Sequence, residues 1–290
     1  MTVFLQYVAG GLAAGSLYAL VALGLTLIYK TTGVVNFAHG EMAMVSTFFA
    51  YIVLTTYHVP YIAAFGGALL FAALLGILIE RGLMRWVQQA SVLSQIMLTL
   101  GLFLVLNGAM STRFFEALPF PQPIGGTPFN IGGVRVSADS ILIFVLTAAI
   151  MAALYLFFRY TLLGVALRAT AQNLTVARLM GVRVGRVYST TWAVAAAMGA
   201  VSGMLFAPTT ALYPGFMGDI AIKGFTGAII GGLGNLPGAV LGGLVLGVLE
   251  NLIAGYISTE LKAFFAFSLI LLVLVARPEG IMGAPVRRRI

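Results

Sequence analysis

The amino-acid sequence predicts an all-α, polytopic integral membrane protein with about eight to nine membrane segments. The chain has 290 residues, of which 61% are hydrophobic and only 8% are charged, whereas soluble domains carry about 25% charged residues. A mean hydropathy of +1.05 leaves too little polar surface for a soluble globule. It also excludes intrinsic disorder, which requires low hydrophobicity. The apolar runs show none of the alternation that is typical of a membrane β-barrel.

The apolar runs define the expected helices in order along the chain. The clear candidates for membrane spans are residues 5–28, 42–57, 61–79, 92–110, 140–158 and 188–207. No charged residue precedes Lys30, so we expect the first run to be a span and not a cleavable signal peptide. Residues 224–257 are long enough for two passes but are interrupted by GGLGNLPG, which indicates a discontinuous or re-entrant helix. Residues 263–276 form a shorter last segment.

The distribution of charge predicts the sidedness of the loops. Residues 80–86, the loop 159–187 and the tail 277–290 are rich in arginine, which favours the cytoplasmic side. The loop 159–187 has five arginines and no acidic residue, while the tail has a run of three near its end. The loop 111–139 has balanced charges and is rich in Pro and Gly, so we expect it to be external. The arginines are Arg159, Arg168, Arg178, Arg183 and Arg186 in the loop and Arg287, Arg288 and Arg289 in the tail.

The net charge of +8 therefore reflects membrane topology, and we expect no nucleic-acid partner. A second compositional signal is the 35 glycines, many of them four residues apart. Glycines at this spacing lie on one helix face and allow neighbouring backbones to approach closely. We expect tight helix packing from such pairs, and a transport pathway near the glycine-rich residues 224–247.

Enzyme motifs are absent from the sequence. None of the three lysines belongs to a GxxxxGK[ST] phosphate loop, and no HExxH or GxSxG motif occurs. The chain has no cysteine and only two histidines, too few ligands for a structural zinc site. We therefore expect a protein that is not an enzyme, with no catalytic residues and no metal or other cofactor bound by this chain.

The densest polar cluster beside an apolar run is YKTTGVVNFAHGEMAM, residues 29–44. Gly33 can end the preceding helix and Asn36 can cap the next one, with His39 and Glu41 in its first turns. A capped helix start at the membrane interface would explain these residues. Polar groups at membrane depth are also candidates for function, so we predict that Asn36, His39 and Glu41 line or gate a translocation pathway.

A second polar cluster contributes Asp219, Lys223 and Asn235 as further pathway candidates. Asp219 and Lys223 are four residues apart, which on a helix brings opposite charges together and explains them as a local ion pair. The alternative is that both face a substrate portal. Asn235 lies in the interruption GGLGNLPG.

The basic loop contains a short helix of its own, in RATAQNLTVARLMGVRVGR. Asn173 is expected to cap its start and Gly181 to follow its end. Leu174, Ala177 and Met180 are expected to share one apolar face. A loop that only sets topology needs charge and no capped helix, so we predict a docking surface for a cytoplasmic partner, flanked by arginines that include Arg178.

Three segments together resemble the LivH-type permease of branched-chain amino acid ABC importers. They are GLAAGSLYALVALGLTLIYKTTGVVNFAHGEMAM, RATAQNLTVARLMGV and GGLGNLPGAVLGGLVLGVLE. The resemblance spans nearly the whole chain and implies one multi-pass permease domain, residues 1–290, in the bacterial inner membrane. It maps the ATPase-coupling element onto residues 168–181, beginning at Arg168. The chain lacks the glutamate and the Ile-x-Leu-Pro of the EAA motif of other importer permeases.

The resemblance also implies partners. They are a sister permease of LivM type, two cytoplasmic ATPase subunits that bind the ATP, and a periplasmic or extracellular protein that binds the amino acid. Transport would proceed by alternating access. The sequence leaves open a permease for urea, short amides or other amino acids, pairing of two identical permeases, and a stand-alone ion-coupled secondary transporter.

Overall fold

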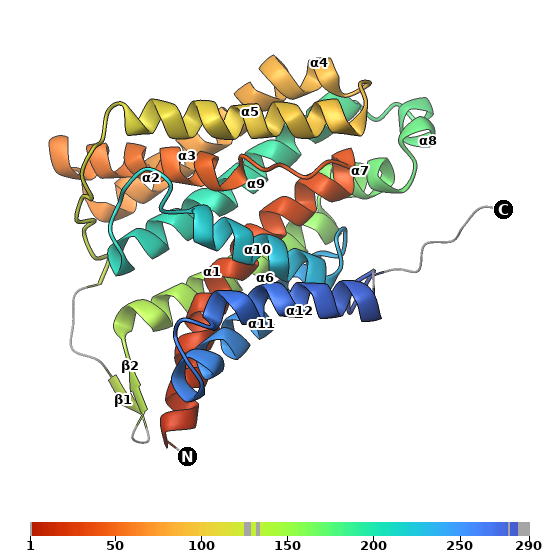
Figure 1. The fold of residues 1–290 in the computed structure, drawn as a ribbon. Helices are drawn as coiled ribbons and strands as arrows, with labels where there is room; N and C mark the ends of the chain where they lie inside the picture. The colour runs from red at the N-terminus through yellow and green to blue at the C-terminus, as the bar shows by residue number, and fades with distance from the viewer. Residues whose placement is uncertain (1, 125–128, 132–133, 278, 284–290) are drawn as a thin grey trace. The chain divides into compact units, whose positions relative to one another are not determined.

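The computed structural model describes residues 2–124, 129–131, 134–277 and 279–283. These residues are mainly helical (Figure 1). Contacts divide the chain into two compact units, and neither is continuous in sequence. Unit 1 comprises Met1–Thr26, Pro121–Thr147 and Asp219–Ile290, and unit 2 comprises Leu27–Phe120 and Ala148–Gly218.

Unit 1 is built around the first helix and the last three. It contains most of α1 (Thr2–Thr32), the start of α6 (Ala138–Tyr160), α10 (Gly218–Gly231), α11 (Leu236–Tyr256) and α12 (Lys262–Ala276). The strands β1 (Phe129–Ile131) and β2 (Val134–Val136) form an antiparallel hairpin before α6.

Glycines bring the backbones of α1, α10 and α11 into direct contact. A Cβ atom built on Gly15 of α1 would lie 2.9 Å from the Cα of Leu244, and one on Gly227 of α10 would lie 2.8 Å from the Cα of Gly243. A Cβ on Gly231 would overlap the carbonyl group of Gly238. The close packing expected from glycines spaced by four therefore holds this unit together, as small residues do at helix interfaces in membranes.

Unit 2 contains a different set of helices. It contains α2 (His39–Thr56), α3 (Tyr61–Ile79), α4 (Arg85–Val87), α5 (Val92–Ser111), α7 (Leu162–Gln172), α8 (Leu174–Leu179) and α9 (Val184–Phe206). The helix α9 packs on the pair α2 and α3, as α1 packs on α10 and α11 in unit 1. A Cβ on Gly76 of α3 would overlap the carbonyl oxygen of Trp192 in α9. Residues Glu80–Met84, between α3 and α4, form a π-helix.

Five of the six clear predicted spans coincide with membrane-length helices, and a sixth such helix covers the second half of the predicted segment 224–257, so the described residues show six membrane-length helices and not eight to nine. Among the described residues, six helical stretches are long and apolar enough to cross a bilayer: Thr2–Thr32, Tyr61–Val87, Val92–Ser111, Ala138–Tyr160, Val184–Thr209 and Leu236–Tyr256. The helices α2, α10 and α12 are too short or too polar to be counted among these stretches. Polar residues such as His39 and Glu41 reduce the hydropathy of α2, and α10 and α12 have only 14 and 15 residues.

Two further points concern the loop 111–139 and the C-terminal tail. Within the loop 111–139, predicted as a connection between helices, β1 and β2 pair as a short hairpin. Water can satisfy the open edges of a hairpin outside the hydrocarbon region, where an all-helical structure is not required. In the tail, Arg287, Arg288 and Arg289 lie outside the described residues.

Candidate functional site

The break between α1 and α2 has the features predicted for it, except for the cap. The helix α1 ends at Thr32, and Gly33 follows with φ +76°, a conformation that glycine adopts without steric cost. The N-cap of α2 is Ala38, which offers no side-chain hydrogen bond. The side chain of Asn36 instead accepts a hydrogen bond from the N–H of Ala38 at 3.1 Å. Asn36 is thus buried in a turn just before the helix, because its short side chain favours local turns.

The side chains of His39 and Glu41 lie in the first turn of α2 and are each only 1% exposed. The ring of His39 packs against Gly199 of α9, where an added Cβ would come 3.3 Å from Nε2. Within the described part of the chain, neither ring nitrogen of His39 has a hydrogen-bond partner. The Oε2 atom of Glu41 accepts a hydrogen bond from Nδ2 of Asn107 at 3.3 Å. Three of the predicted polar residues, Asn36, His39 and Glu41, are therefore buried at or just before the start of α2. The structure adds Asn107, which lies within an apolar run of the sequence and belongs to no motif.

The side chain of Glu250 is the centre of a buried charged cluster in unit 1. One of its oxygens lies 2.7 Å from Nζ of Lys223 and 3.3 Å from Nζ of Lys262. Its other oxygen accepts a hydrogen bond from the hydroxyl of Tyr18 at 2.7 Å. Lys223 also pairs with Asp219 at 2.5 Å, so the predicted local pair forms. The cluster joins α1, α10, α11 and α12, and its two carboxylates balance its two ammonium groups.

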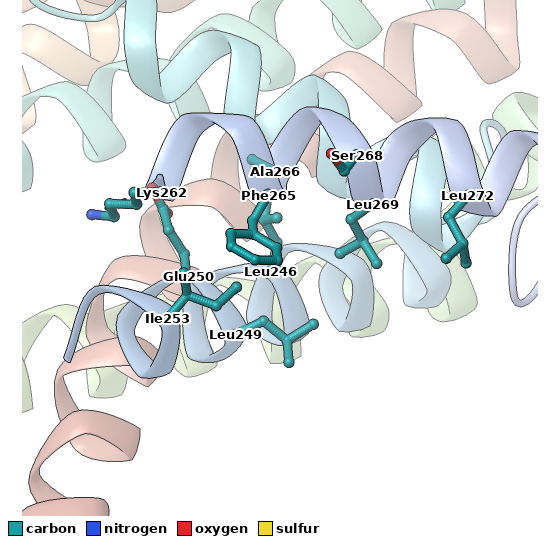
Figure 2. A pocket seen from close by; sticks show the side chains of 10 residues that line it. All are labelled: Leu246, Leu249, Glu250, Ile253, Lys262, Phe265, Ala266, Ser268, Leu269 and Leu272. Atoms are coloured by element: carbon teal, nitrogen blue, oxygen red, sulfur yellow. Dashed lines mark ion pairs between the residues drawn. The ribbon is translucent and has the colours of Figure 1, made fainter. Parts of the chain in front are cut away.

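A cavity of about 240 Å³ lies beside this cluster, between α11 and α12. Figure 2 shows Glu250 and Lys262 at one end of it and Leu272 at the other. The remaining lining is apolar: Leu246, Leu249, Ile253, Phe265, Ala266 and Leu269, with Ser268. The ammonium group of Lys262 lies against Glu250, because a buried carboxylate needs a cationic partner.

Asn235 caps a helix and lies apart from Asp219 and Lys223. Its side-chain oxygen accepts a hydrogen bond from the N–H of Gly238 at 3.1 Å, and its amide donates to the carbonyl of Met282. Asp219 is in the first turn of α10 and Asn235 follows the last turn. Because α10 rises about 1.5 Å per residue, the two are separated by the length of that helix.

The short helix of the basic loop forms as predicted at both ends. The side chain of Asn173 accepts a hydrogen bond from the N–H of Val176 at 3.1 Å and caps α8. Gly181 has φ +82° just after the helix, as is typical of a residue that ends a helix.

The three residues predicted to share one apolar face of α8 do not all pack against the protein. Ala177 is buried and Leu174 packs on the core of α7 and α9. The prediction is wrong for Met180, which is 79% exposed, next to Leu179 at 81%. The helix ends at Leu179, so the periodicity that would bring Met180 inward stops before it. Arg178 is exposed on the same segment.

A third buried carboxylate, Glu80, connects α3 to the start of α9. Glu80 is 1% exposed and pairs with Arg85 at 2.9 Å. The hydroxyl of Ser189 donates to Glu80 at 2.5 Å, and the amide of Gln88 donates at 3.3 Å. The π-helix places Arg85, five residues on, over the carboxylate. The sequence alone predicts only a topological role for these charges, although their spacing of five residues matches the i→i+5 hydrogen bond of a π-helix.

Nearly the whole chain is similar in sequence to known proteins. Residues 7–275 match the family described as branched-chain amino acid transport system / permease component. The chain is 35% identical to the permease protein LivH of Salmonella typhimurium, over 97% of this chain and 96% of that protein. It is 35% identical to BraD of Pseudomonas aeruginosa with the same coverage. It is 31% identical to a probable LivH of Methanocaldococcus jannaschii, over 94% and 91%.

Solved structures with a similar fold include the following one. It is PsaBC from Streptococcus pneumoniae in complex with Fab, with a TM-score of 0.50 and 16% identity over 95% of this chain and 92% of that one. At this identity the likeness concerns the fold alone.

Proposed function

Because this chain belongs to the family of branched-chain amino acid transport permeases, we propose that it is the membrane-spanning subunit of an ABC importer for these amino acids. The observation that carries the proposal is the identity of 35% across 97% of the chain to permeases of high-affinity branched-chain amino acid transport systems. The six membrane-length helices agree with a multi-pass protein of the bacterial inner membrane.

The proposal includes partner subunits, since a transport cycle needs functions for which the sequence has no motif. We propose a sister permease of LivM type, two cytoplasmic ATPases that bind ATP, and an external protein that delivers the amino acid. Alternating access, driven by ATP hydrolysis on the ATPases, then moves the substrate. The shorter helices α2, α10 and α12 are proposed to lie in the membrane as well, with α10 and α11 as a discontinuous pair broken at residues 232–235.

Reconstitution tests this function. Proteoliposomes that contain all five components are expected to accumulate labelled leucine only with ATP, and to lose uptake when the chain, the sister permease or the binding protein is omitted. An ATPase variant that binds but does not hydrolyse ATP is the control. Uptake by this chain alone under an ion gradient would contradict the ABC mechanism, and stronger uptake of urea or short amides would contradict the substrate.

The buried polar residues Asn36, His39 and Glu41 are proposed to line or gate the pathway in unit 2. In unit 1 the same role is proposed for Asp219, Lys223 and Asn235. Burial of unpaired polar groups in a membrane protein is costly, which supports a functional reason for the free ring nitrogens of His39.

The substitution Glu41→Gln tests this role. It keeps the shape of the side chain and removes the charge that accepts from Asn107. We expect ATP-driven uptake to fall about tenfold, since a hydrogen bond to a charged group is worth about 1.5–3 kcal/mol. Uptake is measured at matched protein amounts, with Glu116→Gln in the exposed loop as control. Normal uptake in both Glu41→Gln and Asn36→Ala would remove these residues from the pathway.

A further inference from the structure

Two arginines with no acidic partner line a cavity at the junction of α6 and α7. The cavity has a volume of about 340 Å³ and is lined by Tyr155, Phe158, Arg159 and Arg168. All four belong to unit 2. Within the described residues neither arginine forms an ion pair. No acidic residue occurs in the sequence between Asp139 and Asp219.

The junction is built to hold the two arginines close together. The helix α7 is capped by Thr161, whose hydroxyl accepts a hydrogen bond from the N–H of Gly164 at 3.0 Å. A Cβ on Gly164 would lie 2.6 Å from the Cα of Phe158, so only glycine allows α7 to fold back this closely on α6. Leu167 is 3% exposed and anchors α7 on the core. Arg168, the next residue, is thereby fixed beside Arg159.

Aromatic rings orient the first of these arginines. The guanidinium of Arg159 lies 5.7 Å from the ring centroid of Tyr155 and 5.5 Å from that of Tyr160, within the range of cation–π attraction. It also donates a hydrogen bond to the hydroxyl of Tyr155. Lys30 lies within electrostatic range of Arg168. Two arginines thus line the cavity without a counter-ion from the described chain.

The surroundings of the cavity are those of a membrane surface. The helix α6 has membrane length, and only 11% of its apolar window is buried inside the protein. On α7, Leu162 is 90% exposed and Val165 is 50% exposed. Tyrosines collect where a membrane meets water, and exposed apolar residues beside cations are typical of a helix that lies in that interface.

We propose that this cavity binds the phosphate headgroup of an anionic phospholipid from the cytoplasmic leaflet, held between Arg159 and Arg168. Guanidinium groups match phosphate oxygens with paired hydrogen bonds. Basic pockets at the cytoplasmic ends of membrane helices bind such headgroups. The exposed leucine and valine of α7 would contact the first part of the acyl chains, which a soluble acidic partner would not require. The inference concerns lipid and does not depend on the transported substrate.

Lipid binding by the purified full chain is the test. Delipidated protein in detergent is titrated with dioleoyl phosphatidylglycerol, with dioleoyl phosphatidylcholine and with inorganic phosphate, and bound lipid is counted by native mass spectrometry. We expect phosphatidylglycerol to bind at least about tenfold more tightly than phosphatidylcholine or phosphate, and Arg159→Gln/Arg168→Gln to abolish the preference. The control Arg183→Gln/Arg186→Gln removes the same charge from exposed positions of the loop and is expected to keep it. Arg159→Lys/Arg168→Lys, which keeps the charge, is expected to retain part of the preference.

Several results would overturn the proposal. The first is an equal loss of lipid preference in the glutamine pair and in its control. The second is binding of inorganic phosphate as tight as that of phosphatidylglycerol. The third is a glutamine pair that keeps the lipid preference but no longer binds the ATPase subunits. The last result would assign the arginines to an acidic partner. Because binding is measured without transport, a failure here leaves the importer function unaffected. Equal thermal midpoints of the variants in phosphatidylcholine show that they are folded. If the midpoints differ, the lysine pair, which keeps the charge, distinguishes a loss of charge from a loss of stability.

Discussion

The substitution Glu250→Ala is expected to lower the free energy of unfolding by about 3–5 kcal/mol, because it removes the carboxylate of the buried ion pair with Lys223. Lys262 loses its acidic partner, while Lys223 keeps Asp219. The hydroxyl of Tyr18 also loses its acceptor. The change is measured as a fall in the thermal midpoint of the purified protein and in the amount of folded protein in membranes.

The matched control for this prediction is Glu260→Ala. Glu260 lies in the turn between α11 and α12 and is exposed, so the same charge is removed nearby with an expected change within about 0.5 kcal/mol. Adding Lys262→Met to Glu250→Ala is expected to recover part of the loss by removing the orphaned cation. Equal stability of Glu250→Ala and Glu260→Ala would mean that the buried cluster does not stabilise unit 1.

The second large effect is expected at α8, which we propose as the docking surface for the ATPase subunits. We expect Leu179→Glu/Met180→Glu to reduce ATP-driven uptake about tenfold or more, since interface anchors commonly contribute 2 kcal/mol or more. Both side chains are about four-fifths exposed and free to meet a partner, whereas Leu174 and Ala177 face the protein and orient the helix. Binding of the ATPase subunits and leucine uptake are measured together.

The control for α8 is Gln172→Glu, which adds one negative charge at an exposed residue of the same loop. Its uptake is expected to remain normal. Because Leu179 and Met180 are exposed, their replacement should leave the thermal midpoint nearly unchanged. Undiminished ATPase binding by the double variant would place the docking surface elsewhere, and a lower midpoint would attribute the loss to folding.

The local features of this fold could be read from the sequence because they depend on neighbouring residues. The start and end of α3, the break after α10, the cap at Asn173 and the positive φ of Gly33 and Gly181 agree with the predictions. Each depends on an apolar run bounded by a residue with a strong turn or capping preference. The prediction of a single apolar face for α8 is wrong at Met180, because the helix ends one residue earlier.

The features that could not be predicted depend on contacts between distant segments. Glu250 meets Tyr18 across 232 positions of sequence, and Glu80 meets Ser189 across 109. No periodicity within one helix encodes such a pair. Asn107 was missed for the same reason, since its partner Glu41 lies in another helix. The two arginines of the lipid cavity were predicted as charges of the basic loop, but their proximity depends on the fold at Gly164.

The glycine contacts of unit 1 have a consequence for the entropy of assembly. Helices that meet in lipid gain little from removing apolar surface, since the tails are as apolar as the side chains. Gly15, Gly227 and Gly243 meet other helices through their backbones, and glycine has no side-chain rotamers to lose on burial. The association of α1, α10 and α11 therefore costs little side-chain conformational entropy. Dispersion between touching backbones is then enough to favour the assembled state without a large hydrophobic contribution.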